Sequence, residues 1–338
     1  MASVTKEFEH LKIPLEELKR ATDNFGSKVI GAGGFGKVYE AEISLKGAKH
    51  GCYQAFESWI WARRCRVLER DYDAFPHASD GSLDRHLSSN ALTWAQRFKI
   101  CVDVAKGLAY LHDHKDTQQR VLHRDIKSSN ILLDNNWNAK LSDMGLSKLA
   151  PANQLHTVLF TNVVGTFGYM DPQYMETYAL TKESDIYSFG VVLFEVLCGR
   201  LCFKYTNNRP LEFLVPMWKQ SYRDKNLDHI IFKDVTPPLD PASLETFSDI
   251  AFQCLQYSRE QRPTSSHLVK RLVFACKSQM IHETRHKLKH SDVVGTSWEC
   301  NYVDELSVLS KGKGLFLHAF MVVSSYFASY LKKMESKL

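Results

Sequence analysis

The sequence lacks several features that mark secreted, fibrous or nucleic-acid-binding proteins. Its first residues, MASVTKEFEHLK, carry charges where a secretory leader needs an apolar run, so we expect no signal peptide. The eight cysteines form no Cys-x-x-Cys pair and lie mostly in apolar stretches, which is typical of reduced intracellular thiols. No Lys/Arg block occurs, and a formal charge of +5 over 338 residues is too small to indicate a nucleic-acid partner. A secreted, disulfide-framed or collagen-like protein is excluded, and a cytoplasmic one is expected.

The sequence also favours no membrane-spanning segment. The longest uncharged run, residues 315–331 (LFLHAFMVVSSYFASYL), has seventeen residues and includes His318 and three serines. A helix needs about 20 apolar residues to cross a bilayer. The run therefore predicts a buried helix, with a membrane tail anchor as the alternative.

What is present is ordinary globular composition, with 44% hydrophobic and 24% charged residues, enough chain for one large domain or two. Leu15, Leu18 and Ala21 lie at helical spacing and are followed by turn residues 22–24. The runs KVI and KVYEAEI then predict strands on either side of a glycine cluster. Residues 44–76 show neither a helical nor a strand period.

The later part of the chain favours helices. Residues 92–112 predict a long helix, since apolar residues recur there at three- and four-residue steps. The short apolar runs VLH and ILL follow, and helices are expected to dominate as far as about residue 275. The pattern therefore predicts a small β-rich piece followed by a larger helical one.

The glycine cluster is the first candidate binding element. It reads Ile30-Gly-Ala-Gly-Gly-Phe-Gly-Lys-Val38, and Gly31, Gly33 and Gly36 would let the backbone approach phosphate oxygens where a Cβ would collide. Val38 would place an apolar roof over a base. A dinucleotide fold would need a helix directly after Gly36, whereas the following residues alternate like a strand, so a hairpin type of glycine loop is favoured.

A stronger signal is the segment VLHRDIKSSNILL, residues 121–133, with Asp143-Met-Gly shortly after it. Asp125, Lys127 and Asn130 lie on a polar stretch between two apolar runs. Phosphoryl transfer needs a carboxylate near the attacking hydroxyl, a cation on the transferred phosphate and oxygen ligands for Mg²⁺. Together with Asp143, these residues supply all of those groups within one compact segment.

These motifs resemble a eukaryotic protein kinase. GTFGYMDPQY (165–174) resembles its peptide-binding loop, Asp185-Ile-Tyr-Ser-Phe-Gly its bracing helix, and Arg262-Pro-Thr the arginine near the end of the fold. ELKRATDNF, GSLDRHL, AKGLAYLH and YSFGVVLFEVLCGR are similar to plant receptor-like kinases, near the malectin-like group. The resemblance covers about residues 12–43 and 77–275.

The resemblance implies a two-lobed α+β fold that uses ATP and Mg²⁺. The expected parts are a juxtamembrane-like segment (1–24), a β-rich N-lobe (25–90, atypical over 44–76), a helical C-lobe (91–275) and an extension of unknown role (276–338). Asp125 would be the catalytic base toward a protein hydroxyl, and Lys127 would neutralise the γ-phosphate. Asn130 and Asp143 would hold Mg²⁺. Leu132 would form the floor under adenine, opposite Val38.

The resemblance also implies regulation. Arg124 beside the catalytic aspartate needs an anion partner, for which the candidates are phosphorylated Thr157, Thr161 and Thr166. Of these, Thr166 is expected to contact the catalytic loop instead. Lys127, two residues after the aspartate, indicates serine/threonine specificity. Gln173 stands where most kinases have Glu, so the ion pair with the structural residue Arg262 is expected to become a neutral hydrogen bond.

One kinase element is missing. The family pairs a lysine on the third strand with a helix glutamate, but Lys46 and Lys49 lie in a polar, glycine-interrupted stretch and Glu57 has poorly matching surroundings. Two explanations stay open: a reduced N-lobe, or a segment lost from an active kinase around residues 44–76. The expected function is phosphorylation of protein Ser/Thr in plant receptor signalling, with a plasma-membrane receptor kinase as a further partner. The alternatives are a catalytically impaired scaffold and, from the 315–331 tail alone, a membrane-tethered adaptor.

Overall fold

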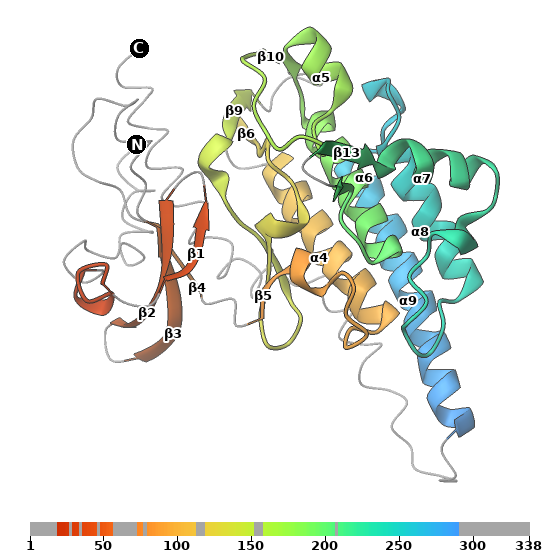
Figure 1. Ribbon diagram of the computed structural model, residues 1–338, viewed down its shortest axis with the longest axis horizontal. Helices are drawn as coiled ribbons and strands as arrows, with labels where there is room; N and C mark the ends of the chain where they lie inside the picture. The colour runs from red at the N-terminus through yellow and green to blue at the C-terminus, as the bar shows by residue number, and fades with distance from the viewer. Residues whose placement is uncertain are drawn as a thin grey trace. The chain divides into compact units, whose positions relative to one another are not determined.

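The computed structural model describes residues 19–26, 29–33, 36–45, 48–56, 73–76, 80–112, 119–151, 158–206 and 209–290 (Figure 1). The chain divides into two compact units between His77 and Ala78. The sequence analysis predicts that the N-lobe ends at residue 90. The division comes earlier because β5 (Gly81–Ser82) pairs with β7 (Ile131–Leu133) of the larger unit.

The described part of the smaller unit is a four-stranded antiparallel sheet in the order β1-β2-β3-β4. Its strands are β1 (Val29–Gly33), β2 (Gly36–Leu45), β3 (Ala48–Phe56) and β4 (Asp73–Pro76). Gly33 and Gly36 face each other where β1 turns into β2, so the glycine cluster does form a hairpin. The turn expected before the sheet is present too, closed by a bond of 2.9 Å from the Gly26 N–H to the Asp23 carbonyl.

Residues 44–76 depart from the sequence analysis because they contain two strands. β3 pairs with β2 along most of its length and with β4 through Tyr53–Phe56. Lys49, expected to lie outside a strand, is on β3 opposite Ser44. Strands of this kind are held by backbone pairing on both sides, which side-chain alternation does not report. Lys46 and Glu57 lie outside the described residues.

The larger unit is built around α6 (Lys182–Cys198), which is buried on almost every face, as expected of a helix that is apolar all round. It contacts α4 (Trp94–His112) and α8 (Pro241–Cys254), whose rings Phe98 and Phe247 stack at 4.2 Å. α6 ends at Gly199, which has φ +65°, and a Cβ there would lie 2.6 Å from the Phe232 ring. Glycine is therefore required at this helix end.

Short strands and helices complete the larger unit. They are β6 (Gln119–Leu122) paired with β9 (Lys148–Pro151), β8 (Ala139–Leu141), β10 (Leu159–Phe160) paired with β11 (Ala179–Leu180), β12 (Phe203–Thr206) paired with β13 (Arg209–Phe213), α5 (Pro172–Thr177) and α7 (Leu214–Arg223). The single-turn 3₁₀ helices are η2 (Leu83–His86), η3 (Ser128–Asn130), η4 (Met144–Leu146), η5 (Leu227–His229) and η6 (Arg259–Gln261).

The last described helix, α9 (Ser265–His290), runs through the expected boundary at residue 275. Beyond that point Cys276, Gln279 and Glu283 are still buried, and Glu283 accepts a 2.8 Å hydrogen bond from the Ala95 N–H at the start of α4. The first part of the expected extension is therefore a continuation of the large unit. Among the described residues, no helix combines the length and apolarity needed to cross a membrane. Residues 315–331 lie outside them.

Candidate active site

The polar segment between β6 and β7 is held in place by one buried carboxylate. Asp185, at the start of α6, accepts 2.8 Å hydrogen bonds from the N–H groups of His123 and Arg124 and a 2.9 Å bond from His112. Burial by itself would raise the pKa of Asp185, but the bond from His112 and the other donors outweigh it and lower the pKa. The carboxylate therefore stays ionised and fixes the backbone just before Asp125.

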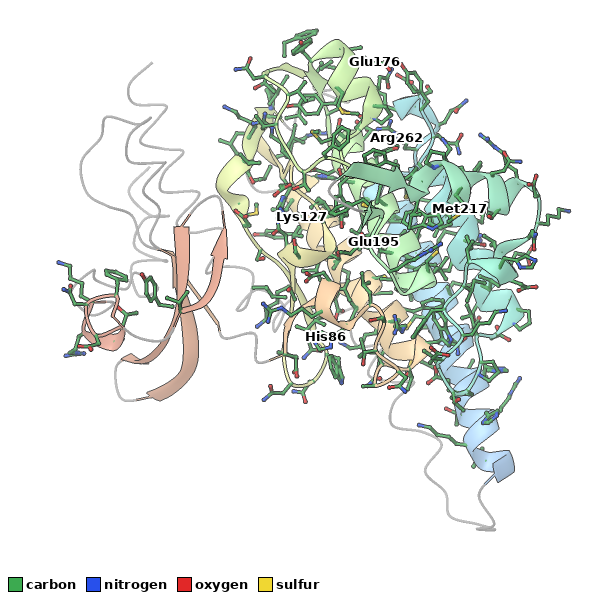
Figure 2. All side chains as sticks on the ribbon, viewed as in Figure 1. His86, Lys127, Glu176, Glu195, Met217 and Arg262 are labelled. Carbon is green, nitrogen blue, oxygen red and sulfur yellow. The ribbon has the colours of Figure 1, made fainter. Side chains whose placement is uncertain are left out.

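Asp125, Lys127 and Thr166 form a closed contact set, and Lys127 is labelled in Figure 2. The Thr166 hydroxyl donates to Asp125 Oδ1 over 2.6 Å and accepts from Lys127 Nζ over 2.9 Å. Lys127 Nζ also lies 2.9 Å from Asp125 Oδ2. Thr166 thus makes the contact to this loop that the sequence predicted for it. The arrangement holds a carboxylate and an ammonium side by side.

Asn130 closes the same loop from the other end. Its side-chain amide donates to the Asp125 carbonyl over 2.8 Å and to Asp125 Oδ2 over 3.1 Å. The side-chain carbonyl oxygen of Asn130 is then the atom left to bind a cation.

Asp143 lies just after β8 in the left-handed conformation, with φ 64°, and its carboxylate accepts a 3.3 Å bond from the Gly145 N–H. Burial raises the pKa of this carboxyl, and the nearby Asp125 charge adds to the effect. A strained, half-buried carboxylate whose charge is disfavoured is a group that a cation would stabilise.

His123 was not singled out by the sequence analysis, although it directly precedes Arg124. It is fully buried, and burial lowers its pKa. Its Nδ1 accepts from the Asp125 N–H over 3.3 Å, and its Nε2 lies 3.0 Å from the Ser142 carbonyl. Only the neutral ring with its proton on Nε2 satisfies both contacts. His123 therefore links the backbone of Asp125 to the residue before Asp143.

Arg124 is buried, with φ 73°, and its guanidinium reaches three neutral acceptors. It donates to the carbonyls of Leu146 and Asn162 over 3.0 and 2.8 Å and to the Tyr174 hydroxyl over 2.9 Å, while its Nε has no hydrogen-bond partner among the described residues. Thr161, one of the predicted anion sites, is half-buried beside Asn162. Thr157 lies outside the described residues.

The expected hydrogen bond between Gln173 and Arg262 is wrong. Arg262, labelled in Figure 2, forms a fully buried ion pair with Asp171, with 2.6 Å between Nη2 and Oδ1. Gln173 Oε1 instead accepts from Arg259 Nε over 2.9 Å. A buried guanidinium requires a charged partner, and Asp171 is the carboxylate that the start of α5 offers. Arg262 therefore keeps an ion pair, and its partner is Asp171.

A buried hydrogen-bonded chain behind the loop was also missed. Ser128 Oγ lies 3.3 Å from the Tyr169 hydroxyl, which donates to Glu195 Oε1 of α6 over 2.6 Å. The Cys202 N–H donates to the same oxygen over 2.7 Å. The only sequence signal was an acidic residue in the apolar run VVLFEVLC.

The remaining predicted binding residues are not brought to this cluster by the described contacts. Ile30, Gly31, Gly33, Gly36 and Val38 belong to the smaller unit, so each unit presents its part separately. Leu132 is half-buried on β7, opposite Ser82 on one side and Lys140 on the other.

Comparison with known proteins agrees with this geometry. The protein kinase domain profile matches residues 72–274. Among curated proteins, the chain is 36% identical over 308 residues to the receptor-like protein kinase ANXUR1 of Arabidopsis thaliana, covering 82% of this chain and 35% of that one. It is 34% identical over 303 residues to the receptor-like protein kinase FERONIA of the same plant, covering 80% and 33%.

The carboxylate and ammonium of the polar loop, the buried aspartate beneath them and the profile match define a protein kinase fold, and the chain belongs to that family. Within that family, the curated relatives that it matches are receptor-like protein kinases of Arabidopsis thaliana. The chain spans about a third of the length of the curated relatives it matches.

Proposed function

We propose that this chain transfers the γ-phosphate of ATP to serine or threonine hydroxyls of proteins in plant receptor signalling. The contact set of Asp125, Lys127 and Thr166 is the observation that carries the proposal. It supplies a base and a cation within hydrogen-bond distance of one hydroxyl, which stands in for the hydroxyl of a substrate.

In this proposal Asp125 accepts the proton of the attacking hydroxyl, and Asn130 and the backbone held by Asp185 orient its carboxylate. Lys127 then meets the negative charge that develops on the transferred phosphoryl group. Because its ammonium is already paired with Asp125, the two groups are positioned before substrate arrives.

The donor set fits a divalent cation and nucleotide. Asn130 offers a carbonyl oxygen and Asp143 a carboxylate whose raised pKa a cation would lower. The ion would compensate the charge of the triphosphate. The backbone of Gly31, Gly33 and Gly36 would approach the phosphates, with Ile30, Val38 and Leu132 against the base.

Arg124 supports control by phosphorylation. Its guanidinium binds the carbonyls of Leu146 and Asn162, both neutral acceptors, and within the described part of the chain its buried Nε has no hydrogen-bond partner. A phosphate on Thr161 or Thr157 would give the Arg124 guanidinium an anionic hydrogen-bond partner. We place the kinase in the cytoplasm, acting with a plasma-membrane receptor kinase.

A second candidate is a catalytically impaired scaffold. Lys49 lies on β3 opposite Ser44, outside the part of that strand that β4 reaches, and the profile match begins at residue 72. Without a lysine on the α/β-phosphates, phosphotransfer would fall by ~10²–10³.

The deciding experiment is phosphotransfer by the full chain and by Asp125→Asn. Asparagine keeps the shape of the side chain but cannot accept the proton, so transfer to protein Ser/Thr should disappear while the melting temperature is retained. Equal turnover in both proteins would show that Asp125 is not the base. Absence of turnover in the wild type would favour the scaffold.

A further inference from the structure

The outward face of α9 carries a row of large apolar side chains. Phe274, Ile281 and Leu288 are 57%, 51% and 60% exposed. Residues seven apart lie two helical turns apart on one side, so the three form a straight row. The opposite face of the helix packs against α4 and α8 through its buried residues Leu268, Leu272, Ala275, Cys276, Gln279 and Glu283. The row therefore lies outside the face through which α9 packs on the rest of the larger unit.

The exposed charged side chains that α9 itself carries have one sign. Lys270, Lys277, Arg285 and Lys287 are exposed on the same helix. Its only acidic residue, Glu283, is buried and accepts hydrogen bonds from the Ala95 N–H and Gln279 Nε2 over 2.8 and 3.2 Å. The helix thus presents apolar side chains bordered by positive charge.

An open hollow lies beside the middle of the row. It is lined by Asp240, Ala242, Ser278, Ile281, His282 and Arg285, from the start of α8 and from α9. Asp240 is fixed there by accepting 2.9 Å hydrogen bonds from the N–H and hydroxyl of Ser243. The walls of the hollow therefore come from two rigid elements, which suits it to receive a side chain of a partner.

We propose that this face of α9 docks an acidic amphipathic helix of a partner protein. The apolar row would lie along the apolar row of that helix, with its Asp or Glu residues opposite the lysines and Arg285. The seven-residue spacing favours a helical partner because it keeps contacts in register along a shared axis.

Two other occupants fit the face less well. A second copy of this chain would bring the same cations against each other. An anionic lipid surface would meet a row one residue wide, interrupted by Lys277 and Thr284, with the Asp240 carboxylate in the adjoining hollow.

The test uses the full chain and two synthetic heptad peptides with leucine at the a and d positions. One carries glutamate at e and g, the other lysine. Fluorescence anisotropy should show binding of the glutamate peptide, weakened by added salt, and none of the lysine peptide. Because the assay needs no phosphotransfer, its outcome is independent of the proposed kinase activity.

Variants locate the binding. Ile281→Ser removes the central apolar side chain and should weaken binding about tenfold to a hundredfold. Phe160→Ser, at an 80% exposed phenylalanine on β10, is the matched control and should bind like the wild type. Lys277→Glu with Arg285→Glu should abolish binding of the glutamate peptide and permit the lysine peptide, whereas Lys225→Glu with Lys233→Glu should change neither. Melting temperatures check that each variant is folded.

The proposal is overturned if both peptides bind equally, if neither binds, or if Ile281→Ser binds as well as Phe160→Ser. It is also overturned if phosphatidylserine vesicles bind the wild type but not the Ile281→Ser variant. Self-association of the chain that the same substitution removes would assign the face to a second copy and would likewise overturn it.

Discussion

Glu195 makes the stability of this kinase depend on pH, and Glu195→Gln should remove that dependence. The side chain is fully buried in α6, and burial raises the pKa of its carboxyl from 4.5 to about 7. Oε1 accepts from Tyr169 and Cys202, while Oε2 makes no hydrogen bond to any residue that the structure describes. Burial therefore favours the neutral carboxyl of Glu195 in the folded state, whereas in the unfolded chain water stabilises the ionised carboxylate.

The sign and size of the pH dependence follow from the difference in the pKa of Glu195 between the folded and unfolded states. Well below pH 4.5 the carboxyl is protonated in both states, so it causes no pH dependence there. As the pH rises toward 7, the unfolded chain releases the proton and the folded chain retains it, so the free energy of unfolding falls. Each pKa unit is worth about 1.4 kcal/mol, which gives a loss of about 3 kcal/mol once the pH exceeds the folded pKa.

The groups that face Glu195 are Tyr169 and Ser128 from the loops and Cys202 beyond α6, with Cys198 on α6 itself. Burial raises the pKa of each of these tyrosine and cysteine side chains, so none of them loses a proton near neutrality. Where α8 meets α6 at Gly190, the contacting residues are Cys254 and Leu255. Between pH 4 and 8, the effect is therefore assigned to the carboxyl of Glu195.

The assay is urea unfolding of the wild type and Glu195→Gln at a series of pH values. All other groups titrate in both proteins, so the difference between their unfolding free energies isolates Glu195. That difference should change by about 3 kcal/mol between pH 4 and 8, in the direction that favours the variant at high pH. Glu245→Gln, at an exposed residue of α8, is the control for the same substitution outside the core. Parallel pH curves for wild type and Glu195→Gln would refute the reasoning.

Two further predictions concern the nucleotide and the buried ion pair. ATP with Mg²⁺ should raise the melting temperature and ATP with EDTA should not. Asp143→Ala should erase the shift and Lys49→Ala should leave most of it; an equal loss in both would place the phosphate-binding lysine at Lys49. Asp171→Asn leaves the Arg262 guanidinium buried without its carboxylate and should cost about 3–5 kcal/mol in urea unfolding. Gln173→Ala loses the two hydrogen bonds that Gln173 Oε1 accepts from the backbone N–H and Nε of Arg259 and should cost about 1–2 kcal/mol, so similar losses in the two variants would contradict the assignment of the ion pair to Asp171.

The reactive segment could be predicted from sequence because its residues are close along the chain. Asp125, Lys127 and Asn130 share one loop between two short strands, so local spacing alone puts them together. The helical period of α4 and the glycine hairpin were predictable for the same reason, since each is a local pattern.

Partners that are distant in sequence were decided by the tertiary structure. The sequence predicted Gln173 as the partner of Arg262, and only the fold shows that the buried guanidinium takes the Asp171 carboxylate. The sequence did not predict β3 because this strand is held by backbone pairing with β2 and β4 on its two sides. The raised pKa of Glu195 follows from burial by surrounding elements, which no neighbour in sequence reports. The sequence by itself determined which reactive groups this kinase carries, and the tertiary structure decided which of them are paired, buried or exposed, because burial and charge pairing arise between segments far apart in the chain.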